Sequence, residues 1–217
     1  TGKCLVMITD DAERTMNTFL GASIDLSERE LDEPALLNSN WLYLEGYLVT
    51  DDTRTDLAIK AMSCAKVNDV KTSISLSDPF VVKAFEKNLE KVIGDGVDLL
   101  FCNLDEALSF TKSFDTDGAI RRLKKYAKTF VITLGADGSI CFDGKELFHT
   151  DGENIDAIDT NGAGDLYAGA FLYAINVGQN YTWAAKFANA AAARVVSQFG
   201  PRLRTVEYQQ LKDQFNI

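Results

Sequence analysis

Segments that favour strands alternate with segments that favour helices from residue 41 onward. Apolar runs of strand length occupy the segments 41–48, 97–103 and 129–135, and the segment 71–77 alternates as a strand does. Between them, apolar residues recur at helical spacing in the segments 52–67, 79–94, 104–110 and 119–127. Strands joined by such helices form parallel βαβ units, and helices then cover both faces of the sheet. The pattern therefore predicts a three-layer α/β/α fold with a mostly parallel sheet.

The two ends of the chain show other patterns. Near the start, 4–9 and 15–21 have strand character around a charged turn, which predicts a small sheet apart from the main core, such as a lid. Asp143-Gly144 is a dipeptide typical of hairpins. Strands are expected on both sides of it and again just after it, at 138–143, 145–150 and 154–159. The rest of the chain is expected to be helical, at 163–178, 181–198 and 205–215.

The composition argues against several classes of function. The net charge of −10 disfavours a surface for nucleic acid or anionic lipid. No apolar run approaches the ~20 residues that cross a bilayer. With no CxxC motif and a single histidine, His149, a zinc site has almost no ligands to use and a Ser-His-Asp hydrolase is disfavoured; we expect His149 on the surface. The four scattered cysteines are expected to be reduced core residues of a cytoplasmic protein: Cys4, Cys64, Cys102 and Cys141.

The sharpest signal for chemistry is the segment 159–165, DTNGAGD, which leads directly into a helical pattern. The free N–H groups of a helix's first turn and the helix dipole attract anions, and glycines let an anion approach the backbone closely. Asp165 would lie at the mouth of this anion hole. A glycine-rich connection, with an Asp that is favourable at any helix N-terminus, explains the same residues without a function.

Two further segments follow predicted strands. TLGADGS at 133–139 comes after one buried strand, and NLDE at 103–106 comes after another. Ligands in open α/β sheets bind at the carboxyl ends of the strands, where both segments are expected. Their plain interpretations are a connecting turn and a helix cap, the latter with Asn103 accepting an N–H group. The three segments together, on one edge of one sheet, favour a ligand site.

In this order and spacing, NLDE, TLGADGS and DTNGAGD resemble the signature segments of the ribokinase-like carbohydrate kinases, the PfkB family. The segment from WLYLEGYL through SLSDPF, and the opening from CLVMIT to FLGAS, are similar to the adenosine-kinase-like branch. The resemblance extends over essentially the whole chain. It implies an ATP-dependent kinase that transfers the γ-phosphoryl group to a hydroxyl of a nucleoside or a sugar. The alternatives are a kinase for another sugar or sugar derivative and, from a different class, a catalytically impaired nucleotide-binding fragment.

The resemblance also implies roles for single residues. Asp165 matches the catalytic base, and Gly162, Ala163 and Gly164 match the anion hole for the phosphoryl group. Glu106 matches a residue that organises the water shell of Mg²⁺.

The expected nucleotide contacts are Asn103, Thr133, Gly135, Asp137, Gly138 and Asn189. A monovalent-cation site, of the kind that takes K⁺, is implied at Asp159, Asn161 and Gly200, although Asn161 stands where some relatives carry a hydroxyl residue.

Family members usually run to about 300 residues or more, so the N-terminal third of the family pattern is expected to be missing. Residues 1–22 would then be part of the lid region, and 23–217 the nucleotide-binding and catalytic core. We expect the opening hairpin to act as a lid or as a homodimer contact. The expected partner is a small-molecule sugar or nucleoside, with no role for nucleic acid or a membrane.

Overall fold

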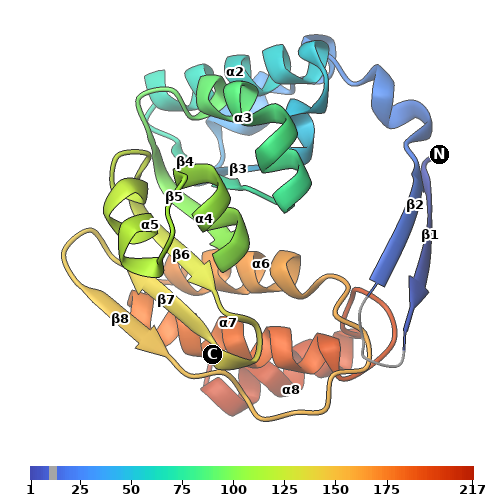
Figure 1. Cartoon of the computed structure of the whole chain (residues 1–217), viewed down its shortest axis with the longest axis vertical. Coiled ribbons are helices and arrows are strands. Elements are labelled where there is room, and N and C mark those ends of the chain that lie inside the picture. Colours follow the sequence, from blue (N-terminus) through green and yellow to red (C-terminus); the bar gives the residue numbers. More distant parts are fainter. Residues whose placement is uncertain (10–13) are drawn as a thin grey trace. The chain divides into compact units, whose positions relative to one another are not determined.

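The computed structural model describes residues 1–9 and 14–217, which form two compact units (Figure 1). One unit combines Thr1–Ile24, Gly135–Ser139 and Phe148–Ile217. The other combines Asp25–Leu134 with Ile140–Leu147. We call them the C-terminal unit and the central unit.

The central unit confirms the predicted alternation. Its strands β3, β4, β5 and β6 are parallel and lie in chain order. They span Trp41–Glu45, Lys71–Ser75, Val97–Asn103 and Ala127–Thr133. Helices α2, α3, α4 and α5 connect or follow them at Asp52–Val67, Pro79–Ile93, Leu104–Thr111 and Thr116–Leu123. Two short strands, β7 (Ser139–Phe142) and β8 (Leu147–Thr150), complete a six-stranded sheet in the order β3-β4-β5-β6-β7-β8.

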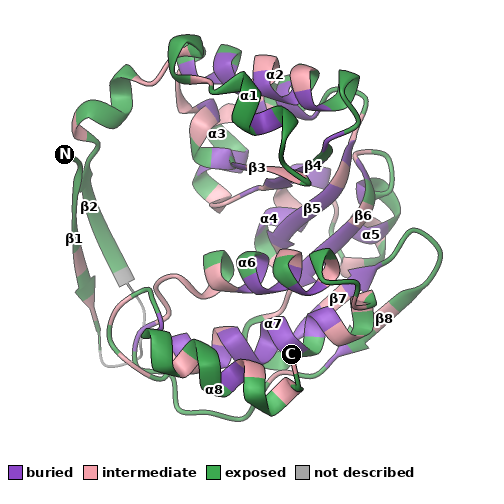
Figure 2. Cartoon of the chain, turned by 180° about the vertical axis from the view of Figure 1, so that it is seen from behind, coloured by how far each residue is buried: buried purple, intermediate pink, exposed green. Residues whose placement is uncertain are grey.

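Local sequence explains where these elements begin and pack. Asp78 caps α3 by accepting a hydrogen bond from Phe80 N, and Pro79 stands at the first helical position. Strand β5 is buried along almost its whole length (Figure 2), as expected for a strand covered on both faces. The short helix α1 (Glu33–Leu37) and the 3₁₀ turns around it lack a long apolar repeat, and the sequence pattern did not predict them.

The C-terminal unit holds three helices that confirm the predicted helical segments: α6 (Ala163–Asn176), α7 (Tyr181–Val196) and α8 (Thr205–Phe215). Helices α6 and α7 pack against each other, and the alanine-rich α7 is mostly buried (Figure 2). The predicted strand at 154–159 is wrong, because this segment has no strand assignment. Ile158 N and Asp159 N both donate to Val196 O, so these backbone groups bond to the end of α7 and not to a strand.

The opening segment forms a hairpin of its own, as predicted. Strands β1 (Lys3–Ile8) and β2 (Arg14–Phe19) pair antiparallel in a two-stranded sheet, while the charged turn at 10–13 lies outside the described residues. Cys4 is exposed on this hairpin, so its assignment to the core is wrong: two strands with no second layer bury little.

The other cysteines differ in burial. Cys102 and Cys141 are buried as predicted, whereas Cys64 is only half-buried. His149 is exposed, as expected. In the part of the chain that the structure describes, no helix has both the length and the apolar character needed to cross a membrane.

Candidate nucleotide and phosphoryl-transfer site

Helix α6 begins at a glycine that no other residue can replace without strain. Gly162 has φ +78, and a Cβ placed on it would lie 2.6 Å from Pro201 O. The first helical bond runs from Leu166 N to Gly162 O at 2.9 Å. No side chain caps the helix. The DTNGAGD segment therefore makes the tight turn that the sequence predicted and leaves the first-turn N–H groups without a side-chain acceptor.

The first turn of α6 is accessible. Gly164 and Asp165 are exposed, and a Cβ placed on Gly164 would meet no atom within 4 Å. Because the helix dipole places partial positive charge at this end, an anion would be stabilised here. The carboxylate of Asp165, on the same turn, is available to a hydroxyl group of a ligand.

Asp159 fastens the loop that precedes this turn. Its side chain is 2% exposed, and its two oxygens accept hydrogen bonds from Asn161 N at 2.9 Å and from Gly200 N at 2.8 Å. The three residues predicted for a monovalent-cation site thus lie together. Both carboxylate oxygens accept backbone N–H groups, so Asp159 fastens this loop whether or not a cation binds there.

The TLGADGS segment packs backbone against backbone within the C-terminal unit. A Cβ on Gly138 would lie 2.0 Å from Thr150 O, and one on Gly152 would lie 2.2 Å from Ala136 O. Just after Gly138, Ser139 Oγ bonds to the hydroxyl of Tyr167 on α6 at 2.8 Å. The segment is therefore held against 150–152 on one side and tied to the helix that carries Asp165 on the other.

Asn189 holds the same region from α7. Its Nδ2 donates to Thr150 O at 3.1 Å and to Asp151 O at 3.0 Å, and the side chain is 7% exposed. The hydroxyl of Thr150 is buried and has no hydrogen-bond partner among the described residues. Neither Thr150 nor Tyr167 stood out in the sequence, since a lone Thr in a strand and a Tyr in a helix give no signal.

In the central unit, Asn103 and Glu106 form a reciprocal cap at the start of α4. Asn103 Oδ1 accepts from Glu106 N at 2.8 Å, while the Glu106 carboxylate accepts from Asn103 N at 3.0 Å and from Asn103 Nδ2 at 2.9 Å. The structural interpretation of NLDE as a helix cap is therefore confirmed. Asn103 also pairs in register with Thr133, so the ends of β5 and β6 lie side by side.

Glu106 is an acid in an unfavourable environment for its charge. Burial raises its pKa to about 7, and the negative charges of Asp78 and Asp105 act in the same direction, against the hydrogen bond from Asn103 N. Among the described residues, no three acidic, His or Cys side chains are grouped closely enough to hold a metal. A buried carboxylate with acidic neighbours fits a Mg²⁺ that is held largely through water, because Mg²⁺ keeps several of its waters.

Each unit thus assembles part of the predicted site. The central unit brings together Asn103, Glu106 and Thr133, and the C-terminal unit holds the larger set of Gly135, Asp137, Gly138, Asp159, Asn161, Gly162, Ala163, Gly164, Asp165, Asn189 and Gly200. The meeting of all three segments at one ligand remains a prediction.

Comparisons with known proteins give a consistent result. Residues 1–207 match the model of a family described as pfkB family carbohydrate kinase. An adenosine kinase of Saccharomyces cerevisiae is 26% identical over 216 residues, which cover 93% of this chain and 62% of that protein.

Solved structures agree with the fold. A probable sugar kinase from Rhizobium etli has a TM-score of 0.94 and 30% identity over 100% of this chain and 66% of its own. An adenosine kinase from Sinorhizobium meliloti has a TM-score of 0.91 and 32% identity over 97% of this chain and 66% of its own. A putative ribokinase from E. coli, solved with ATP and Mg²⁺, has a TM-score of 0.86 at 22% identity, and covers 99% and 71%. The chain therefore spans about two thirds of the length of these proteins.

Proposed function

Because this chain belongs to the pfkB family of carbohydrate kinases, we propose that it carries the ATP-binding and catalytic part of a small-molecule kinase. The reaction is transfer of the γ-phosphoryl group of ATP to a hydroxyl of a nucleoside or a sugar. The observation that supports it most is the first turn of α6, where uncapped N–H groups and the exposed Asp165 lie together on a helix fixed by a glycine turn.

Phosphoryl transfer passes through a loose transition state, so the protein mainly positions groups and stabilises charge. We assign the N–H groups at Gly162, Ala163 and Gly164 to the negative oxygens of the phosphoryl group; that of Ala163 also makes a long turn bond, 3.4 Å, to Thr160 O. One donor of this kind is typically worth ~3 kcal/mol of barrier. Asp165 orients the acceptor hydroxyl and accepts its proton.

The remaining residues serve the nucleotide. Asn103 and Thr133 end adjacent strands, and the TLGADGS backbone, with Gly135, Asp137 and Gly138, continues from the second of them. Asn189 Nδ2 donates to Thr150 O and Asp151 O, and we therefore assign this residue the indirect role of holding 150–151 in place. Glu106 would hold the water shell of a Mg²⁺ ion, which neutralises phosphate charge when it is bound.

Two acceptor classes remain within this proposal. The adenosine kinases among the similar proteins favour a nucleoside, and the probable sugar kinase favours a sugar. A monovalent cation at Asp159, a lid or dimer role for the hairpin, and a cytoplasmic location are further parts of the proposal.

Calorimetry with Mg²⁺ and ATP at up to millimolar concentration tests the proposal on this chain directly. We expect saturable binding that weakens when Gly135 is changed to Val, because a β-branched residue is strained at a φ of +60. A Cβ at this position would meet no atom within 4 Å, so the loss would not come from a clash inside the protein. Folded protein that gives no heat with ATP would contradict the proposal. Turnover assays with adenosine and with ribose as acceptors then separate the two substrate classes.

A further inference from the structure

A cluster of positive charge stands out in this acidic chain. Residues 112–128 carry six Lys and Arg against two Asp, while the whole chain has a net charge of −10. The cluster covers the loop after α4, helix α5 and the turn into β6. It lies within the central unit and contains none of the residues assigned to phosphoryl transfer.

Part of the cluster lines a hollow of about 270 Å³, to which Lys112, Phe114, Arg121 and Arg122 contribute. Arg122 is held in place, because its Nη1 donates to the carbonyl oxygens of Thr111 and Lys112 at the end of α4. Its Nε and Nη2 make no hydrogen bond within the described chain. A guanidinium fixed by one nitrogen presents the others as a fork that matches the oxygens of a phosphate.

The second guanidinium at the hollow, that of Arg121, has no acidic partner among the described residues. Arg121 is exposed and has no hydrogen bond or ion pair in the part of the chain that the structure describes. Lys112 is paired with Glu86 at 2.7 Å. The one acid at the hollow, Asp115, accepts a hydrogen bond from Gly118 N at 2.6 Å, which occupies one of its oxygens in capping α5. The cations at the hollow therefore exceed the acids.

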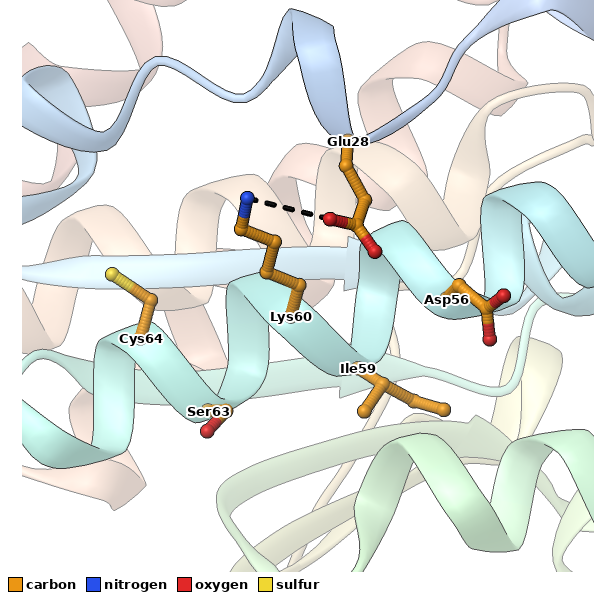
Figure 3. Close-up of a pocket in the computed structure, with 6 residues that line it drawn as sticks. All are labelled: Glu28, Asp56, Ile59, Lys60, Ser63 and Cys64. Atoms are coloured by element: carbon orange, nitrogen blue, oxygen red, sulfur yellow. Dashed lines mark ion pairs between the residues drawn. The ribbon is translucent and has the colours of Figure 1, made fainter.

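Another hollow of the same unit shows the contrast. It measures about 500 Å³ and lies along α2 beside the 3₁₀ turn at Glu28–Glu30 (Figure 3). Its cation, Lys60, is paired with Glu28 and Glu33, at 3.4 Å each, so its charge is already balanced. Of these two hollows among the described residues, the one beside α5 combines uncompensated guanidinium groups with an aromatic ring.

That ring belongs to Phe114, which is fully exposed. An apolar ring in water gains by stacking on a flat partner, and stacking of a nucleic acid base is worth ~1–3 kcal/mol. The hollow is slightly smaller than the ~300–1,000 Å³ of sites that enclose a whole ligand. It therefore suits an anionic group, with the rest of the ligand lying outside on the ring.

We propose that this hollow is a second ligand site, distinct from the phosphoryl-transfer site, for a phosphate monoester that carries a flat ring. The phosphate binds Arg121 and Arg122, and the ring stacks on Phe114. A nucleoside monophosphate is the simplest ligand of this class. The site does not depend on the kinase activity.

The test is a titration of the ¹⁵N-labelled chain with AMP, with inorganic phosphate and with adenosine, at low ionic strength. The amide signals of Gly118 and of Phe114 report this site separately from any binding near Asp165. We expect AMP to shift both signals with saturation, phosphate to shift Gly118 more weakly, and adenosine to shift neither at the same concentration. Absence of saturable shifts with AMP would overturn the proposal.

Three variants sharpen the result. Arg121→Glu should weaken AMP binding ~10-fold or more, because it removes a charge-assisted hydrogen bond. Phe114→Ala should reduce AMP affinity ~10-fold and leave phosphate affinity unchanged. Lys87→Glu, an equal charge change at another exposed helical position, is the matched control and should have little effect.

An equal loss in Lys87→Glu and Arg121→Glu would show general charge attraction and overturn the site. A Glu-rich peptide that shifts the same signals more tightly than AMP would show instead a surface for an acidic protein segment, and would also overturn it. Thermal melting confirms that each exposed substitution leaves the fold intact.

Discussion

The N-termini of α4 and α6 differ in how their free backbone N–H groups are satisfied. At α4, Asn103 and Glu106 satisfy each other's backbone N–H groups, so the helix end is closed by side chains. At α6, Gly162 begins the helix with no side-chain cap, and the following Gly164 and Asp165 are exposed. Both helices follow segments that the sequence marked as a ligand site.

The difference between the two helix ends indicates which of them can bind an anion directly. At α4 the side chains of Asn103 and Glu106 already accept backbone N–H groups at the helix start, so these donors are not available to a ligand. Helix α4 can therefore act on a ligand only through the side chains of the cap. An open end keeps its donors for an anion, at a cost in helix stability that a cap would remove. We therefore assign the phosphoryl group to α6 and an indirect, water-mediated role to α4.

The largest expected effect is on turnover and concerns Asp165. In the active protein, Asp165→Asn should lower kcat by ~10²–10⁴-fold, the usual contribution of a general base. ATP affinity and melting temperature should stay nearly unchanged, because the carboxylate is exposed and caps nothing. If Asp165 only steadies the helix dipole, the change would instead cost ~0.3–1 kcal/mol of stability and spare kcat. Measuring kcat and melting temperature on the same preparations decides between the two.

Glu106 gives a pH-dependent effect on stability. Its folded-state pKa of about 7 lies above the ordinary value of 4.5, so the folded state binds the proton more tightly than the unfolded state. The resulting stability is present in full below pH 4.5 and is lost as pH rises through about 7. The shift corresponds to at most ~3 kcal/mol.

The substitution Glu106→Gln removes this titration. In Mg²⁺-free buffer, we expect the variant to gain ~1–3 kcal/mol over the wild type between pH 5 and pH 8, measured by urea unfolding. Glu153→Gln, at an exposed loop position, is the control. Its free energy of unfolding should differ from that of the wild type by the same amount at every pH. A wild-type profile that runs parallel to that of the variant would show that the closed end of α4 carries no buried charge.

Gly162→Ala tests the turn at the open end. The alanine must adopt φ +78 and place its Cβ against Pro201 O, so we expect a loss of ~2 kcal/mol or more in the free energy of unfolding. Chemical denaturation measures it. A variant as stable as the wild type would mean that the turn can rearrange.

Gly164→Ala gives the smallest change in stability and sharpens the comparison. Its position is helical and open, so alanine should leave stability unchanged or raise it by up to ~1 kcal/mol. If an anion approaches this backbone closely, ATP turnover should nevertheless fall. Unchanged turnover would place the phosphoryl group elsewhere.

Periodic and glycine-containing segments were predictable, and isolated environments were not. The βαβ alternation gave β3 through β6 and their helices, because period and length are properties of sequence. The prediction of a strand at 154–159 was wrong, because the strand character of a segment does not specify a partner strand. The prediction that Cys4 is buried was wrong, because a hairpin pattern in the sequence does not show whether another layer covers the hairpin. The raised pKa of Glu106 results first from burial and then from charges that include Asp78, which is distant in the chain, so no local pattern reveals it.

The glycine contacts at 138 and 152 affect how related sequences should be compared. Since a Cβ at either position would meet backbone atoms at 2.0–2.2 Å, a saturation library at these two codons should yield folded protein almost only with glycine. Invariance there would record packing between two loops and carry no information about the ligand. Gly164 is sterically free, so glycine retained at that codon across diverged sequences would be evidence of selection by the ligand itself.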